Sequence, residues 1–310
     1  MSSKGGRLAA LLDAGEFVLT SEVVPPRSGD GAKVREGARG LVGYVDAVNV
    51  TDNPSASPHM SPLAGARFVH EAGADPTLQL VCRDRNRLAI TADLLGGWAL
   101  GARNLLVLGG DPMDVGDHPD VKAVFDLGPN EVVALARRIR DEGTTGAGAE
   151  IADPPRYLIG VADVPLAGSY DPAKLDAKLD AGGDVVWTQI VYDVDRLGEW
   201  ADLVRPRGVF ERAKVIVGLV ALRSLKNARF LDGLFGVHVP EAAFDLLEAA
   251  GEDAERAGVE FTNDVARRIR AIDGISGLHL LGIGRDDLVR TVVERSGLFP
   301  RPSPGELLAR

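Results

Sequence analysis

The stretch Arg103-Asn-Leu-Leu-Val-Leu-Gly-Gly-Asp-Pro112 joins a short apolar run to a glycine turn that presents one carboxylate, Asp111. An uninterrupted apolar run of this length is typical of a parallel strand that is covered on both faces. Gly109 and Gly110 leave room for a bulky ligand to approach the backbone, because glycine has no side chain. The stretch therefore predicts a buried strand that ends at a place where chemistry can occur.

The same layout, an apolar run with polar residues at its end, recurs along the chain. It is found at Ser21-Glu22-Val23-Val24-Pro25-Pro26, Val50-Thr51-Asp52-Asn53-Pro54, Cys82-Arg83-Asp84-Arg85-Asn86 and Trp187-Thr188-Gln189. We expect eight strands, near residues 16–23, 44–50, 77–82, 103–108, 156–162, 184–189, 213–219 and 277–283. Helix-like segments separate these strands, which is the pattern of repeated βα units. Residues 240–271 are helix-like throughout, so we expect an extra helical segment before the last strand.

The polar residues after the strands would share one rim in the fold class that we predict, an α/β protein with a (β/α)8 TIM barrel. In this fold the functional groups come from the carboxyl ends of the strands. The residues expected to converge there are Glu22, Thr51, Asp84, Asp111, Asp163, Gln189 and Arg285. Residues 142–155 are rich in Gly, Thr, Ala and Pro and predict an exposed loop, because strands continue with the same spacing on both sides. We therefore expect a single barrel domain over residues 1–310.

Composition and charge favour a small molecule as the partner. The chain has 310 residues with 45% hydrophobic content, which suits one barrel. Its 35 basic and 45 acidic residues give a net charge of −10, which disfavours nucleic acid and anionic membrane surfaces. No apolar stretch is long enough to span a bilayer and no signal sequence is evident, so we expect a cytoplasmic protein. Cys82 has no cysteine partner and the five histidines lack metal-ligand spacing, so we expect no metal.

The motifs at the strand ends occur in an order that resembles the methylenetetrahydrofolate reductase family, folate-dependent flavoenzymes built on a (β/α)8 barrel. The similar motifs are Glu22 followed by a proline pair, Val-Thr-Asp-Asn at 50–53, Arg-Asp-Arg-Asn at 83–86, Gly-Asp-Pro at 110–112, Gly-Asp-His-Pro at 116–119, Val-Phe-Asp-Leu at 124–127, Thr188-Gln189 and the segment 279–285. Each motif is weak alone, whereas their shared order and spacing over nearly the whole chain are specific. The resemblance implies reduction of 5,10-methylenetetrahydrofolate to 5-methyltetrahydrofolate by NADH or NADPH, with FAD as hydride relay.

Two carboxylates are the expected catalytic residues. Glu22 follows an apolar strand, where desolvation would favour its protonated form near neutral pH. The resemblance makes it the general acid that protonates N10 of the folate, while a loop cap or an ion pair with Arg27 is the structural alternative. By the same resemblance Asp111 lies beside both flavin and pterin and stabilises the developing iminium cation. Its structural alternative is an Asx turn before Pro112.

The folate ligands are expected at three positions. Gln189 can donate and accept hydrogen bonds at once, as the amide-like edge of a pterin requires, and the resemblance assigns it to folate. The resemblance adds Asn227 and Arg285 as weaker candidates. For Arg285, a salt bridge at the helix start with Asp286 or a neighbour is an equally good explanation.

The flavin positions match the family only in part. By resemblance, FAD would be held by Thr51, Asp111, Ala162, Asp171 and Lys178. Three other positions differ, with Gln79 in place of a histidine, Gly109 in place of an arginine and Val164 in place of a tyrosine. These differences keep open a flavin-free reductase, in which NADH would reduce the folate directly.

Two other classes of protein remain open. One is a pterin-dependent methyl-transfer module that works with a corrinoid or thiol partner, against which the lack of a Cys or His cluster counts. The other is a non-catalytic paralogue that binds folate or a partner enzyme, against which the joint presence of Glu22, Asp111 and Gln189 counts. A homo-oligomer is a further expectation from the resemblance.

Overall fold

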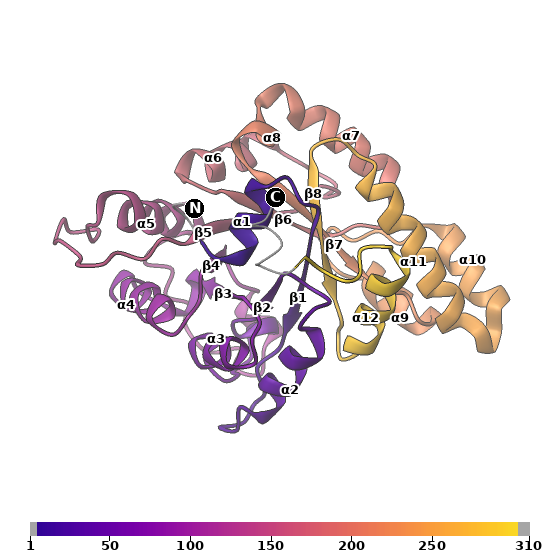
Figure 1. Ribbon diagram of the computed structural model, residues 1–310, viewed down its shortest axis with the longest axis horizontal. Coiled ribbons are helices and arrows are strands. Elements are labelled where there is room, and N and C mark those ends of the chain that lie inside the picture. The colour runs from indigo at the N-terminus through magenta and orange to yellow at the C-terminus, as the bar shows by residue number, and fades with distance from the viewer. Residues whose placement is uncertain (1–4, 303–310) are drawn as a thin grey trace.

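Eight parallel strands close into a barrel in chain order, β1 next to β8 (Figure 1). The computed structural model describes residues 5–302. The strands are β1 Val18–Val23, β2 Ala47–Val50, β3 Pro76–Val81, β4 Asn104–Leu108, β5 Leu158–Asp163, β6 Val185–Ile190, β7 Lys214–Val220 and β8 Ile275–Leu281. Each lies within three residues of a predicted strand, so the predicted (β/α)8 barrel is confirmed.

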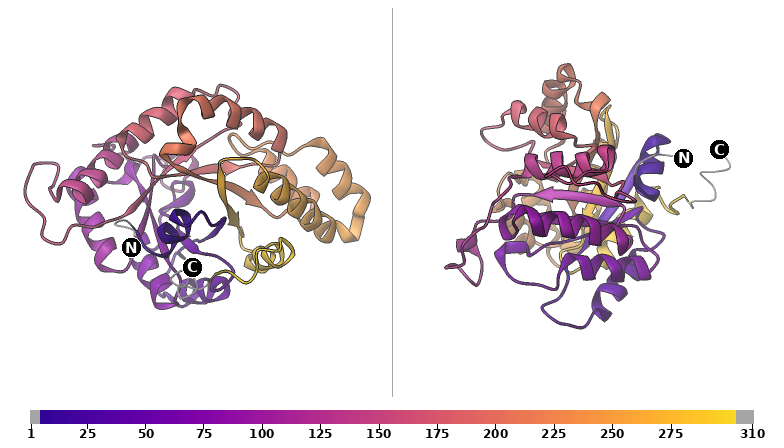
Figure 2. Two further views of the ribbon diagram at one scale, coloured as in Figure 1. Left: turned by 45° about the horizontal axis from the view of Figure 1, so that its top comes forward. Right: turned by 90° about the vertical axis from the view of Figure 1, so that its left-hand side faces the viewer.

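Helices connect the strands and cover the outside of the barrel (Figure 2). They are α1 Arg7–Asp13, α2 Ala32–Leu41, α3 Pro62–Glu71, α4 Arg87–Ala99, α5 Pro129–Glu142, α6 Pro172–Ala181, α7 Val194–Val204, α8 Val209–Arg212, α9 Leu225–Asp232, α10 Glu241–Ala250, α11 Ala254–Arg270 and α12 Asp286–Arg295. Several begin at a side-chain cap, as where Asn86 accepts a hydrogen bond from the Ala89 amide at the start of α4. The expected extra helical segment is the pair α10 and α11, joined through Gly251 at a φ of 53°.

Helix α1 lies across the amino-terminal end of the barrel (Figure 2). Its Leu8, Leu11 and Leu12 are buried against the lowest layer of inward-facing strand residues, which includes Val18 and Ala47. Because this end is closed by apolar packing, the opposite end of the barrel is left for function. Within the described residues, no helix is long and apolar enough to cross a membrane.

A buried carboxylate at the amino-terminal end of the barrel, Asp46, binds arginines near both ends of the described chain. It accepts a hydrogen bond from the Leu19 amide and forms ion pairs with Arg7 at 3.0 Å and Arg301 at 2.7 Å. Since buried charges need partners, this cluster holds the lower rim together.

Candidate active site

Three of the expected site residues face the barrel interior at the carboxyl-end rim. Glu22, Thr51 and Ala162 each lie four positions after a residue of the closed lower layer, namely Val18, Ala47 and Leu158. Side chains alternate along a strand, so a separation of four places them on the same inward face two layers higher. Alternation along these three strands therefore turns the three side chains toward the same interior.

Glu22 has a histidine as its neighbour inside the barrel. Its carboxyl Oε2 lies 3.8 Å from Nε2 of His279 on β8, and the two side chains are 16% and 8% exposed. Below this pair, His279 Nδ1 lies 2.9 Å from the Thr20 hydroxyl, which also accepts a 3.4 Å hydrogen bond from the Trp187 indole. The expected alternative, pairing of Glu22 with Arg27, is not what the structure shows, because Arg27 pairs with Asp117 at 2.6 Å.

Unpartnered polar groups lie on the next strand. The hydroxyl of Thr51 is buried and has no hydrogen-bond partner within residues 5–302, and the same holds for both amide atoms of Asn49. Asn49 is the register partner of Glu22 in the pairing of β1 with β2. Since buried polar groups without partners are costly, this side of the barrel is suited to a polar ligand.

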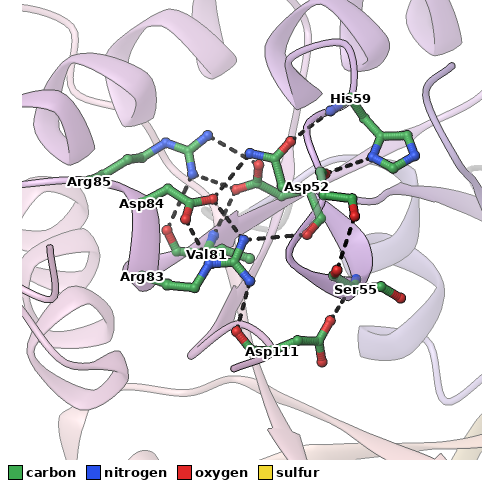
Figure 3. Close-up of polar contacts among 10 residues, drawn as sticks. Asp52, Ser55, His59, Val81, Arg83, Asp84, Arg85 and Asp111 are labelled. Atoms are coloured by element: carbon green, nitrogen blue, oxygen red, sulfur yellow. Dashed lines mark hydrogen bonds and ion pairs between the residues drawn. The ribbon is translucent and has the colours of Figure 1, made fainter. Parts of the chain in front are cut away.

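The ends of β2 and β3 are braced by a buried ion-pair network (Figure 3). Asp52 is fully buried at its side chain and pairs with Arg85 at 2.6 Å, and it accepts a 2.8 Å hydrogen bond from the Val81 amide. Arg85 also pairs with Asp93 on α4 at 2.7 Å. Burial raises the pKa of the Asp52 carboxyl, and Arg85 opposes that rise. The network fixes where two rim loops begin.

A second arginine connects this network to the loop after β4. Arg83 is 2% exposed and binds Asp84 through Nε at 2.7 Å, while its Nη1 donates to the backbone carbonyl of Asp111 at 2.8 Å. Burial opposes ionisation of Asp84, but hydrogen bonds from Arg83 and Asn53 outweigh it and hold the pKa of Asp84 below its usual range. Arg83 therefore holds the turn that carries Asp111.

Asp111 lies at the rim but is exposed. Its Oδ2 accepts a 2.7 Å hydrogen bond from the amide of Ser55, a residue of the loop that follows β2 (Figure 3). That loop is strained, because Ser55 and Ala56 have φ values of 52° and 49°. The Asp111 carboxylate thus connects two rim loops, which differs from the local Asx turn that was the structural alternative.

Gln189 lies where the pairing of β6 with β7 is irregular. Its Nε2 donates to the Phe235 carbonyl at 3.1 Å, and its Oε1 accepts from the Ile190 amide at 2.9 Å. The side chain is partly exposed at the rim. A pterin would therefore have to share or replace these two hydrogen bonds.

The two weaker folate candidates are engaged in other contacts. Arg285 pairs with Glu255 of α11 and Asp287 of α12, both at 2.8 Å, rather than with Asp286. Hydrogen bonds to those two carboxylates raise the pKa of the Arg285 guanidinium. Asn227 is buried at the start of α9, where its Oδ1 accepts from the Arg223 amide at 3.3 Å.

The remaining flavin candidates gather beside β5. The Lys178 ammonium is partly buried and donates to the Ala162 carbonyl at 2.5 Å. Burial lowers the pKa of Lys178, and the nearby Asp163 opposes that change. Lys178, Ala162 and Gly109 line a cavity of about 80 Å³. Asp171 is exposed and caps α6 by accepting from the Ala173 amide at 3.0 Å.

Large apolar side chains are exposed around the same rim. Val24, Val124, Phe125 and Ile283 lie on loops after β1, β4 and β8, and Phe235, 76% exposed, lies beside Gln189 through the hydrogen bond of its carbonyl. Apolar surface around a polar centre is typical of sites for planar organic ligands. Among the described residues there is no group of three or more His, Cys, Asp or Glu side chains that could hold a metal ion.

The sequence did not predict that Glu22 lies beside His279, or that Thr20 and Trp187 lie below this histidine. The sequence held one sign of this arrangement: Thr20 lies two residues before Glu22, and alternation along a strand places both on the same face. Cys82 is fully buried, and burial raises the pKa of its thiol to about 12. Such a thiol is not a nucleophile at neutral pH.

These features define an α/β barrel with a candidate small-molecule site at the carboxyl-end rim, where the half-buried Glu22 carboxylate faces the interior. The sequence model of the methylenetetrahydrofolate reductase family matches residues 7–297. The chain belongs to this family.

Individual relatives are distant. Methylenetetrahydrofolate reductase 1 of Schizosaccharomyces pombe is 28% identical over 73% of this chain and 36% of its own length. A probable NADPH-dependent methylenetetrahydrofolate reductase of Caenorhabditis elegans is 24% identical over 94% of this chain and 44% of its own. The chain thus spans less than half the length of these relatives. A bacterial 5,10-methylenetetrahydrofolate reductase, from Pectobacterium carotovorum, is 22% identical over 74% of this chain and 72% of its own.

A solved structure shares the fold. It is described as an uncharacterized protein from Clostridium thermocellum that binds two copies of 5-methyl-5,6,7,8-tetrahydrofolic acid. It superposes with a TM-score of 0.62 at 12% identity, covering 94% of this chain and 98% of that one.

Proposed function

We propose that this protein reduces 5,10-methylenetetrahydrofolate to 5-methyltetrahydrofolate at the expense of NADH or NADPH. The observation that carries the proposal is the half-buried Glu22 carboxyl group, which faces the barrel interior at the rim beside His279. In the reaction a proton passes from Glu22 to N10, the bond between N10 and the methylene carbon breaks, and a hydride adds to the resulting N5 iminium carbon. The nicotinamide is oxidised, and Glu22 regains its proton from solvent.

The other rim residues have roles in binding and charge stabilisation. The Asp111 carboxylate accepts a hydrogen bond from the Ser55 amide, and Arg83 binds the backbone carbonyl of the same residue. In this position the carboxylate would lie near the N5 iminium and stabilise its positive charge. Gln189 would exchange its contact with Phe235 for the pterin edge. Arg285 and Asn227 are further candidates for folate contacts, with Arg285 releasing Glu255 or Asp287 to bind an anionic group.

The residues at the expected FAD positions fit a flavin. The buried Thr51 hydroxyl lacks a partner among residues 5–302, and a Cβ atom built at Gly109 would lie 3.8 Å from its nearest neighbour outside the adjacent residues, a side-chain carbon of Pro129. Neither position is therefore blocked to a ligand. Lys178 and Asp171 supply a cation and an exposed carboxylate beside β5, and Ala162 and Asp111 complete the set. When bound, a flavin would accept hydride from the nicotinamide and deliver it to the folate.

The second candidate is the same reduction without flavin. The cavity next to Lys178 is only about 80 Å³, and the Lys178 ammonium is already bonded to the Ala162 carbonyl. Direct transfer from NADH to the folate would need neither a larger cavity there nor release of that lysine. Both candidates use Glu22 in the same way.

An absorbance spectrum of the purified protein from about 300 to 550 nm, before and after adding NADH and then methylenetetrahydrofolate, tests both candidates. A flavin spectrum that bleaches with NADH and recovers with folate supports the relay. A colourless protein that consumes NADH only when folate is present supports direct transfer. If neither occurs with NADH or NADPH, the proposed reduction is refuted.

A further inference from the structure

The side chains beneath Glu22 form a chain of hydrogen bonds whose direction can be worked out. The Trp187 indole nitrogen can only donate, so the Thr20 oxygen is the acceptor of their 3.4 Å contact. Thr20 is 0% exposed, which leaves its hydroxyl proton no access to solvent. Within residues 5–302, the remaining side-chain partner of this hydroxyl is His279 Nδ1, at 2.9 Å.

The direction of the hydrogen bond from Thr20 to His279 determines which ring nitrogen of the imidazole carries the proton. If the Thr20 hydroxyl donates to Nδ1, then Nδ1 is an acceptor, and the proton of the neutral ring resides on Nε2. If His279 Nδ1 instead carried the proton and donated it to Thr20, the Thr20 oxygen would accept from both Nδ1 and the Trp187 indole. The buried hydroxyl proton of Thr20 would then have no acceptor, which is costly. The Nε2–H group therefore faces Glu22 Oε2, 3.8 Å away.

We propose that His279 is a positioning residue, which Thr20 and Trp187 hold in the Nε2–H form so that it orients the Glu22 carboxyl group toward the ligand. The separation of 3.8 Å is longer than a hydrogen bond, and contacts of this kind commonly shorten when substrate binds. The carboxylate left after proton donation would be stabilised by the same N–H group. For the reaction that it serves, this inference rests on the proposed function.

The surroundings of Glu22 contain another charge. Asp286, at the start of α12, is close enough for Glu22 to raise its pKa, although burial is the larger cause of that rise. A second carboxylate nearby makes it harder to keep the Glu22 carboxyl group in one orientation without a donor. His279, on β8, supplies that donor.

Two matched variants test the positioning role. A glutamine amide nitrogen reaches about as far as histidine Nε2, whereas an asparagine amide reaches only the Nδ1 position. We expect His279→Asn to lower kcat for folate reduction about tenfold or more with an unchanged KM for folate, and His279→Gln to stay within about threefold of the wild type. Equal kcat values for both variants, or a parallel change in KM and thermal stability, would overturn the proposal.

A measurement independent of activity uses the full chain labelled with ¹⁵N-histidine. The ring nitrogen signals that disappear in His279→Gln belong to His279, and we expect them to show the Nε2–H tautomer and to shift in Glu22→Gln. An Nδ1–H tautomer would overturn the proposal even if the reductase activity is present. Loss of the proposed function would instead be seen as a wild-type protein that reduces no folate while its His279 signals still show Nε2–H.

Discussion

Arg85 is the residue whose loss should most disturb the rim, because it leaves Asp52 buried without its counter-ion. The two side chains are 13% and 0% exposed and lie 2.6 Å apart. Removing one partner of a buried ion pair costs about 3–5 kcal/mol. At about 2.1 cal/mol/K per residue, the unfolding entropy of a 310-residue chain is roughly 0.65 kcal/mol/K, so we expect Arg85→Met to lower Tm by about 5–8 °C.

The matched control is Arg67→Met, which makes the same substitution at the surface. Arg67 is 47% exposed and pairs with Glu71 at 2.9 Å within one helix. Such pairs contribute less than about 1 kcal/mol, so Tm should fall by no more than about 1.5 °C. Differential scanning calorimetry measures the Tm of both variants and of the wild type. Equal Tm values for Arg85→Met and Arg67→Met would refute the argument that the rim depends on the buried pair.

The same variant has a defined pH dependence. Burial raises the pKa of Asp52 in the folded state, and removal of Arg85 raises it further. Between the unfolded and folded pKa values, the native state holds a proton that the unfolded state has lost, so stability falls as pH rises. The difference in Tm between the wild type and Arg85→Met should therefore become smaller as pH is lowered from 7 to 5. A difference that is constant or grows on acidification would contradict this assignment.

Three further predictions concern the barrel and its ligands. Gly160→Ala should lower Tm by about 1.5–5 °C, because the added Cβ would lie 2.3 Å from the Trp187 ring and overpacking costs about 1–3 kcal/mol; calorimetry showing an unchanged Tm would exclude the clash. Asp111→Asn should slow both NADH oxidation and folate reduction if the carboxylate touches flavin, and only folate reduction if the enzyme is flavin-free; stopped-flow rates equal to the wild type would remove Asp111 from the site. Arg285→Ala should raise KM for folate with little change in kcat, whereas a purely structural role with Glu255 would alter only the unfolding curve.

The sequence was sufficient to predict the barrel because the information is local. Apolar runs with polar ends and helical segments between them repeat along the chain, and all eight strands were placed from that pattern. The largest error is at β2, which begins at Ala47 rather than near residue 44. Just before this strand, Asp46 is bound by Arg301, 255 residues further along the chain, and such a contact is not visible in the local pattern.

The inward orientation of three candidate residues was predictable from the sequence, whereas their partners were not. Alternation along β1, β2 and β5 places Glu22, Thr51 and Ala162 inward. Which side chain lies beside each depends on register between strands that are distant in sequence, as for Glu22 and His279 across β1 and β8. The two carboxylates that bind Arg285 likewise come from two helices, so sequence spacing alone could not identify Glu255.

The most direct test of the proposed reduction, with Glu22 as its acid, is the formation of 5-methyltetrahydrofolate by the wild type and by Glu22→Gln. Each protein is incubated anaerobically with the nicotinamide donor and methylenetetrahydrofolate, and the product is measured by mass spectrometry. Glu36→Gln, at an exposed position on α2, is the matched control. We expect product from the wild type and the control, and a rate about 10²- to 10⁴-fold lower for Glu22→Gln with an unchanged Tm. No product from the wild type would contradict the proposed reduction, and equal rates for Glu22→Gln and Glu36→Gln would contradict Glu22 as the acid.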